Sequence, residues 1–132
     1  MVRYLLDTNA VIGLLNGSAP ALTRRVRRVP PAEIGVSSIV VYELFHGAYK
    51  SARMARNLAI TDDIQLQTLE FDREDARRAG AVRAALEQRG TPIGAYDLLI
   101  AGQALARRLT LISRNLREFE RIEGLSVRNW EG

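Results

Sequence analysis

The stretch YLLDTN, residues 4–9, constrains the fold more than any other, because a short apolar run leads directly into Asp7. Such a run is typical of a strand that is buried on both faces of a parallel sheet. The carboxyl ends of these strands line the crevice in which open parallel sheets bind ligands. A bare carboxylate persists there only if it is paired, hydrogen-bonded or bound to a metal. Asp7 is therefore a candidate functional residue, with the N-cap of a helix that starts near Asn9 as the alternative.

Short apolar runs alternate with longer segments of helical periodicity along the rest of the chain. This alternation is typical of βα units that build a parallel sheet. It predicts a single α/β domain, residues 1–132, with a central, mostly parallel sheet of four to five strands. The expected strands are residues 2–6, 34–37, 64–69 and 110–113, with a weak fifth at 125–127. The expected helices are residues 9–15, one opened by Pro20, 39–50, 51–60, one capped by Asp72 and stopped by Gly90, and 95–108.

The composition limits the kinds of chemistry that are possible. Cysteine is absent and His46 is the only histidine, which excludes disulfides, zinc sites built from thiolates or several histidines, and a cysteine nucleophile. Any metal must therefore be held by oxygen. No apolar run reaches the roughly 18 residues of a membrane span, and Asp7 interrupts the one apolar stretch near the start. We expect a soluble, cytoplasmic protein.

The charge is positive and is carried almost entirely by arginine. The net charge is +4, and the 19 basic residues are Lys50 and 18 arginines. Because the planar guanidinium group pairs with phosphate through two hydrogen bonds, this excess favours a polyanionic partner such as nucleic acid. Coding bias of the host genome is the alternative explanation.

Two further carboxylates occur in apolar surroundings. Glu43 lies in IVVYELF, residues 39–45, which is too apolar all round for a surface helix. Asp97 stands between Gly94 and the run LLIA, residues 98–101. Alternative roles are open for both: Glu43 could share a polar stripe with His46 and Lys50, and Asp97 could stabilise a helix dipole.

The three carboxylates together predict more than each one alone. In a parallel fold, residues at a strand end, in a helix and at a helix start can converge on one crevice. Their mutual repulsion is relieved by a hard divalent cation, and an all-oxygen set suits Mg²⁺ or Mn²⁺. Such a site can clamp a phosphodiester during in-line displacement and lower the pKa of a bound water. The sequence therefore predicts a metal-dependent nuclease, in which Asp7 and Asp97 ligate the ion and Glu43 ligates it or orients the attacking water.

With these residues in place, the sequence resembles the PIN-domain ribonucleases, and more closely the VapC-type toxins of type II toxin–antitoxin pairs. The resemblance covers essentially the whole chain and rests on YLLDTN, VYELFHGAYKS, IGAYDLLIAGQA and LISRNLREFERIEGLSVRNW. It implies a three-layer α/β/α fold and dependence on Mg²⁺ or Mn²⁺. It also implies endonucleolytic cleavage of RNA, for which tRNA is a candidate, to a 5′-phosphate and a 3′-hydroxyl, with inhibition by a cognate VapB-type antitoxin.

The last of these blocks departs from the broader family at Asn115, where many members have an aspartate. Close VapC-type relatives often have asparagine there, so the resemblance implies an active-site role for Asn115 in positioning water or substrate. Its weaker anionic character argues against a tightly bound second metal. Glu118 is expected to be a solvated helix residue, with supply of the missing charge as the alternative. Hydrogen-bond partners for the carboxylates are expected among Thr8, Asn9 and Ser113.

Other features suggest partners or rival assignments. Apolar helix faces around Leu44, Phe45 and Leu58 suggest a homodimer. Asp62 and Asp63 form the best rival acidic pair, although aspartates between a helix and a strand commonly serve turns. A non-catalytic PIN-like module that binds nucleic acid or a partner is the second hypothesis. An aspartyl-phosphate phosphohydrolase is the third, but it needs an aspartate where Asn9 stands.

Overall fold

The computed structural model describes residues 1–132 and contains one five-stranded sheet in the order β3-β2-β1-β4-β5. All four neighbouring strand pairs are parallel, and Leu5 lies opposite Gly35 on one side and Leu111 on the other. The prediction of a parallel α/β fold is confirmed. The strands are β1 (Tyr4–Leu6), β2 (Ile34–Ser37), β3 (Gln67–Leu69), β4 (Thr110–Ile112) and β5 (Val127–Arg128).

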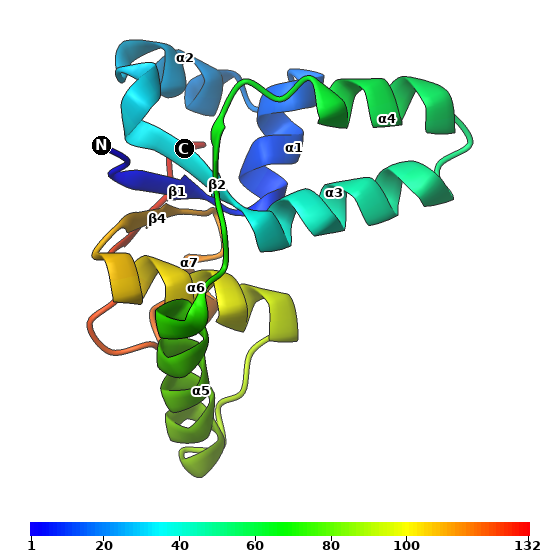
Figure 1. Ribbon diagram of the computed structural model, residues 1–132. Coiled ribbons are helices and arrows are strands. Elements are labelled where there is room, and N and C mark those ends of the chain that lie inside the picture. The colour runs from blue at the N-terminus through cyan, green and yellow to red at the C-terminus, as the bar shows by residue number, and fades with distance from the viewer.

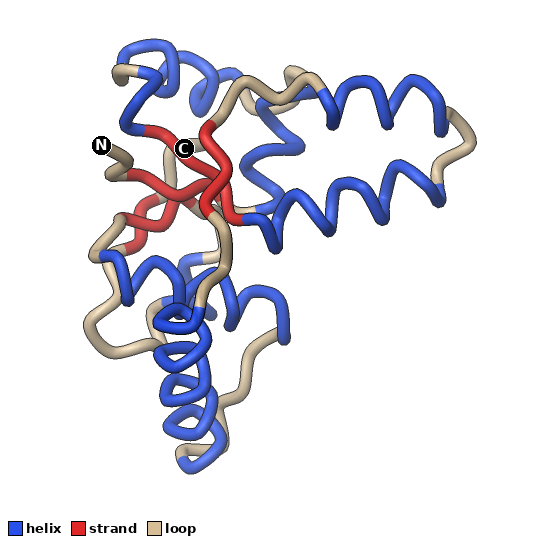
Figure 2. The backbone as a smooth tube through the Cα atoms, viewed as in Figure 1, coloured by secondary structure: helices blue, strands red, loops and turns tan.

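Helices cover both faces of the sheet, which gives the three expected layers. Figure 1 shows α1 and α2 on one side of the strands and α5 and α6 on the other. The antiparallel helices α3 and α4 form an arm that projects from the edge of the body, as Figure 2 also shows. The helices are α1 (Thr8–Asn16), α2 (Pro20–Arg28), α3 (Ser38–Lys50), α4 (Met54–Asp62), α5 (Arg73–Gln88), α6 (Ala95–Arg107) and the short α7 (Leu116–Phe119).

The helix ends follow from local chemistry. The Asp72 side chain accepts a hydrogen bond from the Asp75 N–H, and the Asp75 side chain accepts one from the Asp72 N–H, so that α5 begins in a capping box. The chain leaves α1 through Gly17 with a φ of 73°, a left-handed conformation that glycine adopts without steric cost. Both boundaries agree with the sequence-based prediction.

The structure corrects several expected boundaries and burial assignments. β3 begins at Gln67 instead of Ile64, and it is an edge strand whose residues are mostly exposed, not buried. The expected helix 51–60 begins at Met54, because the Ser51 hydroxyl holds a turn by accepting hydrogen bonds from the Arg53 N–H and the Asn57 amide. The helix expected at Glu118 is the one-turn helix α7, whose bounds the sequence did not predict. None of the helices is both long enough and apolar enough to span a membrane.

The central strands supply the middle of the core. Leu5, Leu6, Val36 and Leu111 are fully buried within a cluster of 21 buried hydrophobic residues. Leu44 belongs to the same cluster and is only 8% exposed. Leu44 is therefore unavailable for the apolar dimer face that the sequence suggested.

A pair of glycine substitutions tests the close packing of α5 on α6. A Cβ added at Gly102 would lie 2.6 Å from the Cα and Cβ of Ala79, whereas one added at Gly80 would meet nothing within 4 Å. We expect Gly102→Ala to lower the free energy of unfolding by about 1–3 kcal/mol through overpacking. Gly80→Ala, the matched control, should raise it by about 0.5–1 kcal/mol because alanine favours helix. Urea denaturation measures both values, and equal effects would contradict the packing.

Candidate active site

Asp7 lies where the sequence placed it, directly after β1 at the carboxyl edge of the sheet. Its side chain is 3% exposed, and Oδ1 accepts a hydrogen bond of 2.9 Å from the Ala10 N–H as the N-cap of α1. Asp7 therefore does cap a helix, as the alternative interpretation of its position expected. Burial raises the pKa of Asp7 above its ordinary value, although hydrogen bonds from Ser113 and the Ala10 N–H act in the opposite direction. These two hydrogen bonds leave part of this buried carboxylate's acceptor capacity available.

Glu43 faces the same edge from the middle of α3. Its Oε1 accepts a hydrogen bond of 2.8 Å from the Thr8 hydroxyl, so the residue that follows Asp7 fixes the Glu43 side chain. Glu43 is half-buried, and no ion pair joins it to Lys50. The polar stripe with His46 and Lys50 is therefore not what the structure shows.

Asp97 lies in the first turn of α6 and is the most perturbed acid of the group. Burial raises its pKa from 3.8 to about 6, with further contributions from three neighbouring carboxylates, namely Asp7, Glu118 and Glu43. A dipole role alone would lower this pKa, because the positive end of a helix favours the charged form. The charges of Asp7, Glu118 and Glu43 all act on Asp97, which indicates that these carboxylates lie in its neighbourhood.

Asn115 belongs to the site together with Glu118, which the sequence did not mark as a site residue. It follows β4, and its backbone N–H donates to the Ser113 hydroxyl at 2.9 Å. Its amide Nδ2 donates to Glu118 Oε2 at 2.6 Å. Glu118 is half-buried and its charge acts on Asp97, so it belongs to the site instead of being a solvated helix residue. The three-residue spacing between Asn115 and Glu118 was the available signal, and the alternative role of Glu118, supply of the missing charge, is the one that this contact favours.

The hydrogen-bond partners expected around the carboxylates are found in two of three cases. Thr8 holds Glu43, and Ser113 holds Asp7. Asn9 is exposed, and no hydrogen bond of its side chain is present. Both partners found are hydroxyl groups that fix the orientation of a carboxylate, as the outer shell of a metal site commonly does.

The donor chemistry of this cluster fits a hard divalent cation. Four carboxylates and one amide oxygen offer only oxygen ligands, the type that Mg²⁺ and Mn²⁺ prefer. No three acidic or histidine side chains converge closely enough to enclose an ion in their present conformations. Hydrogen bonds to Thr8, Ala10 and Asn115 hold individual carboxylates apart. Binding would therefore require side-chain rotation, driven by the attraction between the cation and the carboxylates, which would also offset the like charges that act on Asp97.

Two residues near Asp7 were not anticipated. The charges of Glu131 and Arg114 both act on Asp7, Glu131 raising its pKa and Arg114 lowering it. Their side chains face each other, with Arg114 Nη1 3.8 Å from Glu131 Oε1. Glu131 lies next to the end of the chain, where Trp130 packs at 7% exposure against Tyr4. No local pattern connects residue 131 with residue 7, so only the fold could reveal this neighbour.

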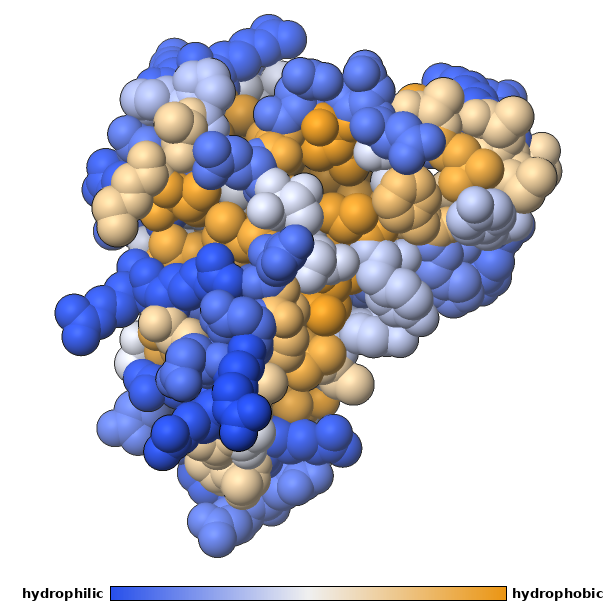
Figure 3. Space-filling model, viewed as in Figure 1, coloured by the Kyte–Doolittle hydropathy of each residue, from blue (hydrophilic) through white to orange (hydrophobic).

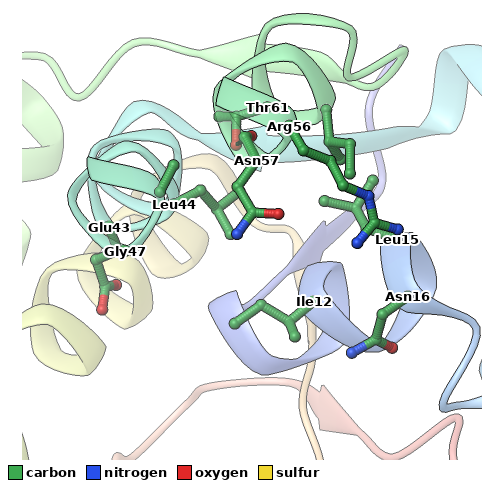
Figure 4. A pocket seen from close by; sticks show the side chains of 11 residues that line it. Ile12, Leu15, Asn16, Glu43, Leu44, Gly47, Arg56, Asn57 and Thr61 are labelled. Carbon is green, nitrogen blue, oxygen red and sulfur yellow. Dashed lines mark hydrogen bonds between the residues drawn. The ribbon is translucent and has the colours of Figure 1, made fainter. Parts of the chain in front are cut away.

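A groove adjoins the carboxylates between α1, α3 and α4. It encloses about 340 Å³, and Glu43 lies in its lining. Figure 4 shows Ile12 and Leu15 of α1 on one side and Asn57 and Arg56 of α4 on the other. Ile12 and Leu15 are 41% and 39% exposed, and Figure 3 shows hydrophobic surface between α1 and the arm. The groove is thus an apolar surface that leads to one of the site carboxylates.

The rival candidates lie elsewhere in the structure. Asp62 ends α4 and Asp63 follows it in a turn, where its main-chain carbonyl accepts a hydrogen bond from Gln65. His46, the single histidine, is exposed and stacks on Tyr42, with ring centroids 6.3 Å apart. None of these three residues contributes to the carboxylate cluster.

Comparison with known proteins gives consistent matches over nearly the whole chain. The family described as PIN domain matches residues 4–125. The tRNA(fMet)-specific endonuclease VapC of Salmonella typhimurium is 38% identical over 132 residues, covering 98% of this chain and 99% of that protein. Ribonuclease VapC2 of Haemophilus influenzae is also 38% identical, with the same coverage.

The fold agrees with a solved relative as well. The DNA-bound VapBC complex from Salmonella typhimurium contains a chain that superposes with a TM-score of 0.93 at 38% identity. That match covers 98% of this chain and 99% of the other. The arrangement of strands and helices described above is therefore the one found in this relative.

Proposed function

This chain belongs to the PIN-domain family, and we propose that it is the toxin of a toxin–antitoxin pair, an endoribonuclease that a VapB-type antitoxin inhibits. The observation that carries the proposal is the gathering of Asp7, Glu43, Asp97 and Glu118 at the carboxyl edge of the sheet. Relatives named as ribonucleases and a toxin relative solved in a VapBC complex support it. The reaction would take place in the cytoplasm on RNA, with tRNA as the candidate substrate.

We propose that Asp7 and Asp97 hold Mg²⁺ or Mn²⁺, and that Glu43 either completes the ligand set or orients water. Such an ion polarises a phosphodiester and offsets negative charge that develops on its oxygens. Because the Thr8 hydroxyl donates a hydrogen bond to Oε1 of Glu43, Oε2 is the atom that can accept a proton from the attacking water. Asn115 and Glu118 position water or substrate at the opposite side of the cluster. In-line attack on phosphorus would leave a 5′-phosphate and a 3′-hydroxyl.

The groove between α1, α3 and α4 is the surface that we propose for the antitoxin. Ile12 and Leu15 expose apolar surface along the groove. An amphipathic segment that buried these side chains would extend toward Glu43 and cover the approach to the carboxylates. Inhibition by coverage of this kind needs no change in the fold of the toxin. We also propose a homodimer, formed through surfaces other than this groove.

Dependence on a divalent cation tests the proposal. Purified tRNA should be cleaved in Mg²⁺ or Mn²⁺, and EDTA should lower the rate by at least about a thousandfold, because the ion supplies several kcal/mol of transition-state stabilisation. Binding should also raise the unfolding temperature of the wild type, since an ion that binds only the folded state stabilises it. Asp97→Asn should abolish this thermal shift. Cleavage that persists in EDTA would contradict the metal proposal.

A further inference from the structure

Two tyrosines form an exposed aromatic surface beside the carboxylates. Tyr42 on α3 is 51% exposed and Tyr96 on α6 is 43% exposed. Their ring centroids are 5.6 Å apart with the planes inclined by 58°, and their hydroxyl groups lie within 3.2 Å of each other in a hydrogen bond from Tyr96 to Tyr42. The His46 ring lies nearly parallel to that of Tyr42, at an interplanar angle of 13°. We refer to Tyr42 and Tyr96 as the tyrosine pair.

The tyrosine pair borders the site from two separate elements. Tyr42 immediately precedes Glu43, and Tyr96 immediately precedes Asp97. The middle of α3 and the first turn of α6 thus each carry one aromatic residue next to one carboxylate. The hydrogen bond with Tyr42, and more weakly the charge of Glu43, raise the pKa of the Tyr96 hydroxyl.

Core packing does not account for this arrangement. Both tyrosines are exposed, and an exposed hydrogen bond between two hydroxyl groups contributes little to folding. Nucleobases of single-stranded RNA stack on exposed aromatic side chains, and this interaction tolerates any base sequence. The base and the phosphate of a nucleotide are neighbours, so a ring that borders the carboxylates lies where a base next to the scissile phosphate would fall.

We propose that the tyrosine pair is a stacking site for an unpaired nucleobase of the RNA, adjacent to the carboxylates that act on its phosphodiester; this inference rests on the proposed ribonuclease function. The chemistry favours RNA over a second copy of the chain. A symmetric contact through the tyrosine pair would place the carboxylate clusters of two copies near each other. Their like charges would oppose that contact.

Substitution of each ring tests the stacking site in two assays. Tyr42→Ala and Tyr96→Ala should raise KM for tRNA cleavage in Mg²⁺ by about five- to 150-fold, which corresponds to the cost of losing one stacked base. The value of kcat should change little. Tyr42→Phe and Tyr96→Phe keep the rings and should retain the wild-type KM. Tyr49→Ala removes the other exposed tyrosine of α3, which lies outside the pair, and it is the matched control.

Binding separates this inference from the proposed function. Fluorescence anisotropy with labelled oligoadenylate, in an Asp97→Asn background that prevents cleavage, should show the same loss for the alanine variants. An abasic oligomer of equal length should bind all variants alike. Ring-dependent binding without any cleavage of tRNA by the wild type would reject only the proposed function. Normal cleavage with ring-independent binding would overturn only the stacking site.

Two further outcomes would also overturn the stacking site. Phenylalanine variants as impaired as the alanine variants would assign the effect to the hydrogen bond between the hydroxyl groups. A fall in mass from two chains to one in the alanine variants, measured by light scattering, would show that the pair is a contact between copies. We expect the mass to be the same in all variants and in the wild type.

Discussion

Replacing Asp7 by asparagine is expected to lower the rate of RNA cleavage by at least about a thousandfold, because it removes an anionic metal ligand that the mechanism requires. The fold should be preserved, since asparagine caps a helix as well as aspartate does and can keep the bond to the Ala10 N–H. Burial raises the pKa of Asp7, so its ionised form destabilises the folded state at neutral pH. The variant should therefore be at least as stable as the wild type.

Cleavage assays and urea denaturation of the same preparations measure both effects. Asp62→Asn is the matched control, because Asp62 is an exposed carboxylate at the end of α4, away from the cluster. Its rate and stability should both be unchanged. Full activity of Asp7→Asn would remove Asp7 from the mechanism. If the variant failed to fold, its loss of cleavage would not be evidence of a catalytic role for Asp7.

Arg107→Leu is expected to cause the largest loss of stability among the substitutions considered. Arg107 binds the buried Asp75 through two hydrogen bonds, Nε to Oδ1 at 3.2 Å and Nη2 to Oδ2 at 2.9 Å. Asp75 is 1% exposed and also accepts a hydrogen bond from Gln103. Removing one partner of a buried ion pair leaves an uncompensated charge, which costs about 3–5 kcal/mol. Urea denaturation at pH 7 should show a loss of this size.

The ion pair between Asp75 and Arg107 also predicts how the stability difference between the wild type and Arg107→Leu depends on pH. Burial opposes ionisation of Asp75, but hydrogen bonds from Arg107 and the Asp72 N–H outweigh it and lower the pKa of Asp75 below its ordinary value. A depressed pKa contributes stability above the unfolded pKa of about 3.8, and this contribution is lost as pH falls through the folded pKa. The difference in the free energy of unfolding between the wild type and Arg107→Leu should therefore become smaller below pH 4.

Arg77→Leu serves as the control for removing an arginine from this part of the molecule. Arg77 is exposed on α5, and none of the ion pairs involves it. Its loss should change the free energy of unfolding by no more than about 0.5 kcal/mol. A similar loss in both variants, or a gap for Arg107→Leu that stays constant down to pH 3, would contradict the role assigned to the buried pair.

The sequence predicted the strands best where both neighbours of the strand are also strands. Ile34–Ser37 agrees with β2 at both ends, because every residue of this segment is buried and the pattern is continuous. The prediction failed at the edges of the sheet. There strands were expected at 64–69 and 125–127 but with wrong bounds, since β3 is Gln67–Leu69 and β5 is Val127–Arg128, where exposed or few residues give no clear burial pattern. These segments are strands because their backbones pair with a neighbouring strand, and the sequence of a segment does not show this pairing.

A carboxylate of the site was predictable where its position in the sequence is unfavourable for a charged side chain. Asp7 after a buried strand and Asp97 before a buried helix both called for an explanation, and both lie in the cluster. Glu118 did not, because glutamate on a short polar segment looks ordinary. Its role depends on α7 turning back toward Asp97. Glu131 depends on the chain end folding against β1, which no spacing encodes.

Paramagnetic broadening by Mn²⁺ in NMR spectra of the whole chain tests the shared cation most directly. At substoichiometric Mn²⁺, we predict that the signals of residues 7, 43, 97 and 118 broaden together, because a single ion lies near all four carboxylates. The signals of Asp62 and Asp63, the other acidic pair, should remain sharp. Broadening centred on Asp62 and Asp63, or spread evenly over all acidic residues, would contradict a cation shared at the carboxyl edge of the sheet.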